Sequence, residues 1–443
     1  MRQHVSRIAL QARQTLPEGT GVVGAGLAVA AATSYVFVIV ALNALDGTAD
    51  AAFSAYWAII FVAGPGFFLP LEQEVGRALA HRRAQGLGGG PLVTRAARLG
   101  GIITGLMVVL SIAATPLLID RMYDGDYLFV VATAVGLVSF YVMHTVRGVL
   151  AGSGRFTNYG VLIGSDGTIR LIAGIVLAVV GVDRAGAFAL ALALSPFFAV
   201  AVALWGQRGL LTPGPEAPYS ELSASLGWLL VGSVVMQALA YSPLLAVNLL
   251  STTPSEKDVA AAFASAFFIA RIPVLAYQAV QGTLLPKLAG LAGSGRHDEF
   301  RRGVTRLLVV VAAVALLGTI GAFVLGPTAG EILFADFSLD ATGLGLLAAG
   351  SGAFIVALTL AQALTALGGH RLQAIAWVIG LAVCVAVIAV IPDLELRVEL
   401  GFLVGALVAV TAMAGLLWKR MSVAGDVPIE GLIDAIEHEP IEI

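Results

Sequence analysis

Long apolar stretches, separated by short polar connectors, follow one another along almost the whole chain. Each stretch has about the 20 apolar residues that a helix needs to cross the hydrocarbon core of a bilayer. The connectors contain glycine, proline or charged residues, which end such helices. The pattern predicts twelve membrane-spanning helices, at residues 20-43, 51-75, 98-119, 127-147, 158-181, 185-206, 224-250, 259-284, 304-326, 341-366, 372-391 and 398-418.

The composition agrees with this pattern, because hydrophobic residues make up 58% of the chain and charged residues only 12%. Soluble globular proteins have about 25% charged residues. We therefore expect an all-α integral membrane protein. The first apolar run, from Val22 to about Asn43, is too long for a typical signal sequence and is expected to remain as the first span. The single cysteine, Cys384, excludes an internal disulfide and a cysteine-based metal cluster.

Basic residues are distributed unevenly between the two sides of the predicted membrane. When the spans alternate, nineteen of the 25 lysines and arginines fall on the side of both termini and four on the opposite, acidic side. Cytoplasmic connectors are enriched in basic residues, so both termini are predicted to be cytoplasmic. The basic connectors 76-98 and 287-306 are expected to contact anionic lipids, or to recruit a diphosphate lipid at the inner leaflet.

A proline-rich connector, QRGLLTPGPEAPYSE, divides the spans into two sets of six. Two halves with an even number of spans have the same orientation in the membrane. They are predicted to form two lobes, related by an axis along the membrane normal, around a central cavity. The predicted organisation is an N-lobe (1-206), a cytoplasmic linker (207-221), a C-lobe (222-420) and an acidic cytoplasmic tail (421-443).

The two halves also resemble each other weakly in local sequence. The second span begins AAF at Ala51 and contains Pro65, and the eighth has AAF at Ala261 and contains Pro273. Chance similarity between helices rich in alanine and glycine is the alternative to an internal repeat. Each half has a glycine-rich connector with an arginine after its fourth span, AGSGR at 151-155 and LGGHR at 367-371.

These features, together with an eighth span that reads RIPVLAYQAVQGTLLPKLAGLAGSG, resemble the multidrug/oligosaccharidyl-lipid/polysaccharide (MOP) exporter superfamily. The polysaccharide-export flippase branch looks most similar. The resemblance implies a MATE-like fold whose two lobes alternate access to a central cavity. It implies a plasma-membrane protein of a bacterium that moves a polyprenyl-diphosphate-linked oligosaccharide, a precursor of cell-surface polysaccharide, to the outer leaflet. Anionic lipids and glycan-assembly enzymes are further expected partners, and nucleic acid is not.

Two arginines lie inside predicted spans, where a charge costs at least about 2.5–3.5 kcal/mol and by default indicates a function. Arg271 in span eight and Arg170 in span five are at similar depth and in different halves. Guanidinium groups bind phosphate oxygens in a bidentate manner, so the two arginines are predicted to hold an anionic head group. The alternative for Arg170 is an ion pair with Asp166, four residues earlier on the same helix. Asp166 is also a candidate protonation site for coupling.

Polar residues extend along spans seven and eight. Gln237, Tyr241 and Asn248 form one stripe on span seven, and Gln278 lies two helical turns after Arg271. Such a stripe suits a hydroxyl-rich sugar, and it equally suits hydrogen bonds between helices.

Prolines inside spans two and eight are expected to bend these helices. Pro65 with Gly66, and Pro273, are therefore candidate hinges, with a static kink as the alternative. Glu72, near the cytoplasmic end of span two, is explained by snorkelling or by local pairing with Arg77.

Other functions compete with the flippase hypothesis. The main alternative is an ion-coupled multidrug or organic-cation antiporter of the same superfamily, which would need carboxylates in its cavity. The first span has none, and two intramembrane arginines against one aspartate favour an anionic substrate. A glycan polymerase or ligase would need a large external loop, and every external connector is short. The sequence has no P-loop, nucleophile elbow or metal-ligand cluster, so no enzymatic activity, cofactor or metal site is expected.

Overall fold

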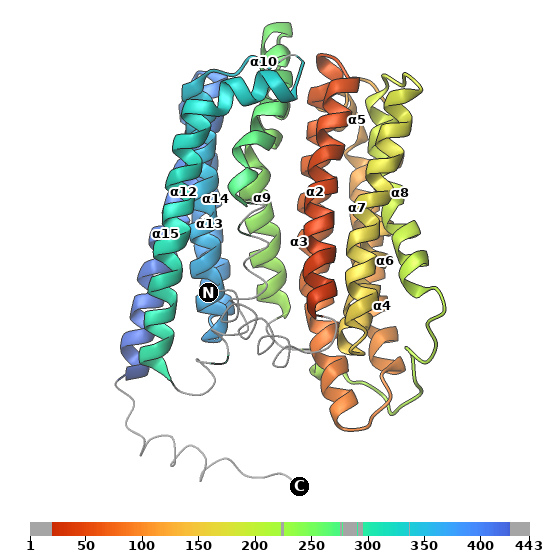
Figure 1. The fold of residues 1–443 in the computed structure, drawn as a ribbon. Helices are drawn as coiled ribbons and strands as arrows, with labels where there is room; N and C mark the ends of the chain where they lie inside the picture. Colours follow the sequence, from red (N-terminus) through yellow and green to blue (C-terminus); the bar gives the residue numbers. More distant parts are fainter. Residues whose placement is uncertain are drawn as a thin grey trace, which may run out of the picture.

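The computed structural model describes residues 20–222, 226–274, 277, 290, 296–335 and 337–425, and the regular structure within them is entirely helical. The helices run roughly parallel in two side-by-side groups (Figure 1). The first group consists of α2 (Thr20–Ala44), α3 (Thr48–Ala84), α4 (Gly90–Ala113), α5 (Thr115–Arg121), α6 (Leu128–Gly152), α7 (Phe156–Val179) and α8 (Ala185–Leu204). After a short 3-10 helix, Tyr219–Glu221, the second group consists of α9 (Leu226–Leu250), α10 (Pro254–Ala270), α12 (His297–Leu333), α13 (Ala341–Ala366), α14 (His370–Val390) and α15 (Leu394–Gly425).

Eleven of the described helices are long and apolar enough to cross a membrane, so the chain is a multi-pass membrane protein. They correspond to eleven of the twelve predicted spans. The remaining one, predicted at 259-284, coincides with α10 and the residues up to 274. Apart from Tyr277, the rest of that span lies outside the described residues.

Several helices extend beyond the apolar stretches that predicted them. α3 continues to Ala84 and α12 begins at His297, so both predicted basic connectors are largely helical where they are described. The turn between α3 and α4 is only residues 85–89. Arginine and glutamate are good helix formers, so a helix can continue past the lipid boundary. Hydropathy marks only the part of a helix that crosses lipid.

The two groups form two lobes, because helices pack mainly within their own group. In the N-lobe, α2 packs on α7, and α6 packs on α3 and α8; in the C-lobe, α13 packs on α12 and α15, and α14 packs on α9 and α15. Contact between the lobes is made mainly by α3 of the N-lobe with α9 and α10 of the C-lobe. We refer to the end of the bundle where α10 begins as the α10 end, and to the opposite end as the linker end.

The segment between the lobes is attached to the N-lobe by several contacts, and one buried arginine makes most of the hydrogen bonds among them. The side chain of Arg82, at the linker end of α3, is 2% exposed and donates to both carboxylate oxygens of Glu221, at 2.7 and 2.9 Å. Its guanidinium also donates to the carbonyl oxygens of Gly88, Pro215 and Glu216, at 2.9, 3.0 and 2.9 Å. Arg77 also donates to the carbonyl of Glu221, at 2.8 Å, and the N–H of Gly90 donates to the carbonyl of Thr212, at 2.9 Å. The linker is therefore a docked element of the N-lobe.

The two connectors that correspond in the weak internal repeat have the same helix-end geometry, which is also found at the ends of α3 and α7. α6 and α13 both end in a turn with a glycine in the left-handed region, Gly154 at φ 72° and Gly368 at φ 71°. In both turns the next residue donates its N–H to a carbonyl five residues earlier, Arg155 to Leu150 at 2.8 Å and Gly369 to Leu364 at 2.8 Å. This is the pattern of a Schellman helix end, which requires a residue with positive φ. The fourth helix of each half therefore ends in the same way.

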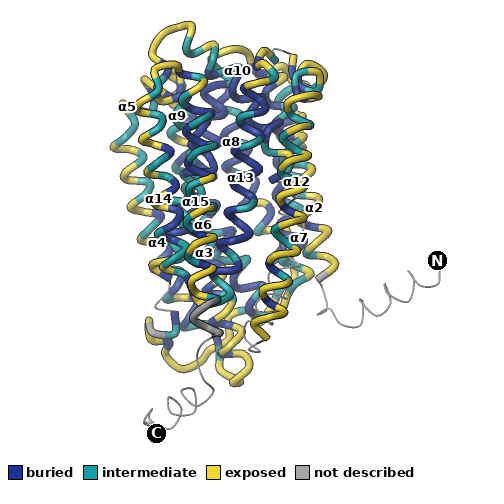
Figure 2. Tube along the Cα trace, turned by 90° about the vertical axis from the view of Figure 1, so that its left-hand side faces the viewer, coloured by how far each residue is buried: buried dark blue, intermediate teal, exposed yellow. Residues whose placement is uncertain are grey.

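Burial separates the interior of the bundle from its lipid-facing side (Figure 2). In α13, 78% of the most apolar 18-residue window is buried, whereas in α12 only 6% is. α12 exposes large apolar side chains, among them Val309, Leu317 and Leu325. In a multi-pass protein such a surface faces the hydrocarbon of the bilayer. α13 is thus the central helix of the C-lobe, and α12 lies at its lipid boundary.

Candidate functional site

The contact between the lobes is built around a proline in the middle of α3. Because Pro65 has no N–H, the carbonyl of Phe61 lacks its normal helical partner. That carbonyl instead accepts a hydrogen bond at 3.0 Å from the side-chain nitrogen of Gln237 on α9. Gly66 brings the two backbones close, because a Cβ at this position would lie 3.3 Å from the Cα of Val234. Pro65, Gly66 and Gln237 thus meet at one point of the lobe interface.

Further polar contacts join the lobes between Pro65 and the α10 end. The side-chain amide of Asn248 on α9 donates to Ser54 of α3 at 3.3 Å. The hydroxyl of Tyr35 on α2 donates to the carbonyl of Phe268 on α10 at 3.4 Å. At the end itself, Lys257 of the C-lobe forms an ion pair with Asp124 of the N-lobe at 3.2 Å.

Asn43, the penultimate residue of α2, contacts the C-lobe through both the nitrogen and the oxygen of its side-chain amide. Its side-chain nitrogen donates to the carbonyl of Leu333 at 2.8 Å, and its oxygen accepts from the N–H of Ala335 at 3.0 Å. Leu333 is the last residue of α12, and Ala335 belongs to the connector between α12 and α13. Together with the contacts above, this amide holds the lobes together at the α10 end.

Arg271 follows directly after α10 and has an aromatic environment. Its guanidinium carbon lies 4.7 Å from the ring centre of Tyr241, 5.1 Å from that of Phe267 and 5.9 Å from that of Phe354. It donates to the carbonyl of Ala240 at 2.6 Å. None of the ion pairs found in the described part of the chain includes Arg271. The positive charge is therefore supported by ring faces and one carbonyl, without a counter-ion from these residues.

The local sequence of α9 explains how this environment is formed. Pro243 cannot donate to the carbonyl of Leu239, so the hydroxyl of Ser242 donates to it instead, at 2.9 Å. The disturbed turn includes Ala240 and Tyr241, the two α9 residues that contact Arg271. The Tyr241 ring also lies 6.0 Å from that of Phe61 in the N-lobe. The Tyr241 ring therefore lies between Arg271 and the N-lobe side of the interface.

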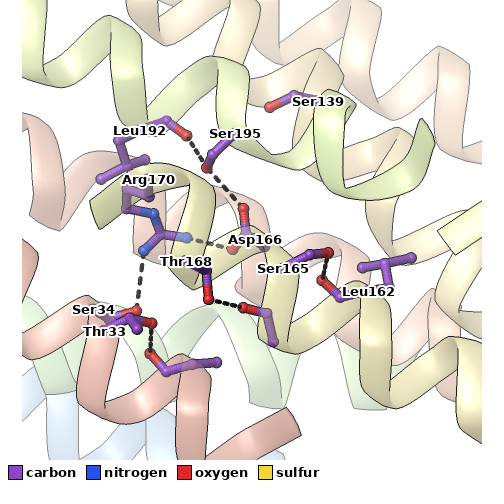
Figure 3. A network of polar contacts seen from close by, with 12 residues as sticks. Thr33, Ser34, Ser139, Leu162, Ser165, Asp166, Thr168, Arg170, Leu192 and Ser195 are labelled. Atoms are coloured by element: carbon purple, nitrogen blue, oxygen red, sulfur yellow. Dashed lines mark hydrogen bonds and ion pairs between the residues drawn. The ribbon is translucent and has the colours of Figure 1, made fainter. Parts of the chain in front are cut away.

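Arg170, the second predicted arginine, lies inside the N-lobe (Figure 3). Its guanidinium forms an ion pair with Asp166, and both residues are buried, at 2% and 8% exposure. It also donates to the hydroxyl of Ser34 on α2 at 3.3 Å. The ion pair that the spacing of four residues allowed is therefore present. It neutralises the charge of Arg170, whereas Arg271 has no such partner among the described residues.

Asp166 has a second partner on a neighbouring helix. Its second carboxylate oxygen lies 2.7 Å from the hydroxyl of Ser195 on α8, which is also 3.1 Å from the carbonyl of Leu192. Because Pro196 leaves the carbonyl of Leu192 without its helical donor, that carbonyl is a second acceptor for the same hydroxyl proton. The Ser195 proton thus has two alternative acceptors, one of which is the titratable carboxylate.

The remaining predicted site residues are found in different settings. Tyr241 and Asn248 are buried at 9% and 3% exposure, and both lie at the lobe interface described above. Pro273 packs on α12, where a Cβ on Gly318 would lie 2.6 Å from its ring. Gln278 lies outside the described residues.

A buried polar cluster at the linker end of the N-lobe is more extensive than the local pairing expected for Glu72. Its carboxylate contacts the His144 ring at 2.6 Å and accepts from the Tyr159 hydroxyl at 2.8 Å. Arg147 lies 3.2 Å from the same carboxylate. Since these partners come from α6 and α7, residue spacing along α3 carries no signal of the cluster.

Comparison with known sequences gives relatives without a described function. No protein-family model matches the chain. It is 25% identical over 405 residues to Uncharacterized protein Rv1510 of Mycobacterium tuberculosis, covering 90% of this chain and 91% of that protein. It is 24% identical over 411 residues to Uncharacterized protein Mb3654 of Mycobacterium bovis, covering 88% and 89%. The similarity extends over most of the chain in both cases.

Comparison with solved structures shows the fold. A multidrug resistance MATE family transporter of the MOP superfamily in its inward-facing conformation matches with a TM-score of 0.70 at 14% identity, over 89% of this chain and 96% of that chain. An outward-facing conformation of such a transporter matches with a TM-score of 0.66 at 13% identity, over 93% and 100%. A MOP superfamily transporter from Pyrococcus furiosus, described as having a binding pocket of reverse polarity, matches with a TM-score of 0.64 at 13% identity, over the same shares. The chain therefore has the two-lobed fold of these transporters.

Proposed function

We propose that this protein is a flippase that moves a polyprenyl-diphosphate-linked oligosaccharide from the inner to the outer leaflet by alternating access, without enzymatic activity. The observation that carries the proposal is Arg271, a cation beside the lobe interface that no carboxylate of the described residues neutralises. A guanidinium in this situation favours an anionic ligand. Its fork of donors matches the oxygens of a diphosphate.

The lobe contacts suggest which step of the transport cycle this conformation represents. With the linker end on the cytoplasmic side, as the distribution of basic residues predicts, the contacts of Asn43, Asn248 and Lys257 close the outer side. The somewhat higher TM-score with the inward-facing transporter agrees with this assignment. In this state the diphosphate would enter from the inner leaflet toward Arg271, while the prenyl chain remains in lipid.

The polar stripe of α9 would act at a later step of the cycle. In this conformation the side chains of Gln237 and Asn248 bond to α3 across the interface. When the lobes separate at the α10 end, both amides lose these partners and become available to sugar hydroxyls. Tyr241, which supports Arg271, and Gln278 complete the proposed substrate-binding residues. Pro65, Gly66 and Pro273 are the proposed hinge positions.

Asp166 is the proposed coupling residue of the N-lobe. When ionised, it accepts the Ser195 proton and pairs with Arg170. When protonated, it could donate to the Ser195 oxygen, and the Ser195 proton would then turn to the carbonyl of Leu192. Arg170 would hold Asp166 in place rather than contact the substrate directly.

An ion-coupled multidrug antiporter is the second candidate function, because solved transporters with this fold include multidrug resistance proteins. The description of a reverse-polarity pocket for one of them supports the view that the fold alone does not set the charge of the substrate. The aromatic surroundings of Arg271 would suit a lipophilic compound, but the arginine itself repels a cation.

Thermal unfolding of the purified protein with candidate ligands tests the proposal. A polyprenyl-diphosphate sugar should raise the melting temperature of the wild type. Arg271→Ala should weaken binding by about 1.5–3 kcal/mol, roughly 10- to 100-fold in Kd, because a charge-assisted hydrogen bond is lost. Arg184→Ala is a matched control, since this arginine is exposed, pairs with Asp126 and lies outside both basic connectors. Stabilisation by lipophilic cations and by no diphosphate lipid would replace the flippase with the antiporter.

A further inference from the structure

Glu399, in the second turn of α15, is a buried carboxylate without a compensating partner. It is 3% exposed, and its Oε1 atom has no hydrogen-bond partner. Within the described residues, no lysine, arginine or histidine forms an ion pair with it. Arg397 is two positions away on the same helix and therefore lies on a different face. An isolated ionised carboxylate is so costly to bury that such a group is normally neutralised.

Two further carboxylates converge on the same place. A Cβ built on Gly343 of α13 would lie 2.4 Å from the Oε1 atom of Glu399, 3.1 Å from that of Glu395 and 3.3 Å from the Oδ1 atom of Asp340. Glu395 lies one helical turn before Glu399, and Asp340 caps α13 by accepting from the N–H of Gly343 at 2.7 Å. The bare glycine is what allows three acidic side chains to approach one another here.

Within the described residues, the charged groups that act on Glu399 are all acidic. They are the carboxylates of Glu395 on α15, of Asp340 at the start of α13, and of Asp393 in the turn after α14. Glu331, on the neighbouring α12, is also acidic and is exposed. Like charges this close cannot all be ionised at once. The described residues contain no group of three side chains arranged to hold a metal ion. A proton is a cation that one buried carboxylate can bind without such a group.

We propose that Glu399, with Glu395 and Asp340, forms a proton-binding site at the α10 end of the C-lobe. Asp340 is exposed and Glu395 is half-buried, so the three carboxylates lead from solvent to the buried Glu399. The proton resides on Glu399 at neutral pH and reaches it from the solution at that end. This site is separate from the Asp166–Arg170 pair, which lies in the other lobe.

The position of the site gives the bound proton a role, and this part rests on the proposed function. Asp340 ends the connector between α12 and α13, and near the other end of this connector Leu333 and Ala335 hold Asn43 of the N-lobe. Loss of the proton would place repelling negative charges at the start of α13 and α15 and loosen this connector. A protonated Glu399 therefore favours contact of the lobes at the α10 end.

Infrared spectroscopy of the purified protein tests proton binding without any substrate. The wild type should show the C=O band of a protonated carboxylic acid at neutral pH, and Glu399→Gln should lose it. Glu399→Asp, which keeps an acid in the same place, should shift the band rather than abolish it. Glu331→Gln removes an exposed glutamate of the same end and should leave the band unchanged.

The dependence of thermal stability on pH is an independent measurement. The stability of the wild type should fall as the pH rises from about 4.5, the ordinary pKa of a glutamate side chain, and level off once the buried carboxylate has itself ionised, because within this range only the folded protein keeps the proton. Glu399→Gln should flatten this dependence. The proposal is overturned if the wild type has no protonated-acid band at neutral pH, or if the band is identical in Glu399→Gln and Glu399→Asp. It is also overturned if sodium ions stabilise the wild type at fixed pH and not Glu399→Gln, because a metal cation would then occupy the site. Each of these results would leave the diphosphate-binding test of Arg271 unaffected.

Discussion

Removal of the Asn43 side chain should shift the protein toward a conformation that is open at the α10 end. Asn43→Ala deletes two hydrogen bonds between the lobes, to Leu333 and from Ala335, at 2.8 and 3.0 Å. A typical hydrogen bond contributes about 0.5–1.5 kcal/mol net, so the loss is about 1–3 kcal/mol. Since 1.4 kcal/mol is tenfold in an equilibrium constant, the open population should rise roughly 5- to 150-fold relative to the closed one.

Distance measurement between two spin labels can follow this shift. Suitable positions are the exposed Asp46 in the N-lobe and the exposed Ser255 in the C-lobe, after replacement of the buried Cys384 by alanine. Asn158→Ala is the matched control, because the Asn158 amide donates to Ala203 within the N-lobe, at 2.9 Å. If Asn43→Ala shows the same distance distribution as the control, these hydrogen bonds do not hold the α10 end closed.

Two further predictions concern ion pairs of the N-lobe. Acid should release the linker, because the hydrogen bond from Arg82 lowers the pKa of the Glu221 carboxyl in the folded protein. The stabilisation of the docked linker by this ion pair is therefore fully present above pH 4.5, the ordinary pKa of a glutamate, and is lost as the pH falls through the lower folded-state pKa. Pepsin cleavage within residues 207–221 should therefore increase sharply only at low pH, and Glu221→Gln should increase cleavage by a neutral protease already at neutral pH. Asp166→Asn should destabilise the protein by about 3–5 kcal/mol in thermal unfolding, because it leaves the buried Arg170 unpaired. The double variant with Arg170→Gln should recover most of this loss, and an equally unstable double variant would contradict the reasoning.

The architecture could be predicted from sequence because each span carries its own signal. Apolar length and the bias of basic residues are local properties, and eleven predicted spans match described helices. The ion pair of Asp166 and Arg170 was also visible, since both residues lie on one helix at a spacing of four. The extended ends of α3 and α12 were missed, because a helix in water at the membrane surface has no hydropathy signal.

The candidate site was only partly visible because its chemistry depends on contacts between helices. The sequence offers Arg170 a partner on its own helix, but it carries no signal of the surroundings of Arg271, whose neighbours are aromatic rings from α9, α10 and α13. Glu399 reads in the sequence as one more acidic residue near an outer connector. Its burial results from the packing of α13 and α15 around Gly343, and the amino-acid sequence does not show which helices pack together.

The proline in the middle of α3 has a consequence for how easily the lobes can come apart. The carbonyl of Phe61 has no donor in its own helix, whatever the conformation of the protein, so its bond to Gln237 competes with no helical bond. When the lobes separate, water can replace the Gln237 amide at that oxygen at little net cost, because hydrogen bonds to water are of similar strength. The two lobes can therefore dissociate at this point and re-form the same contact without any helix having to unwind.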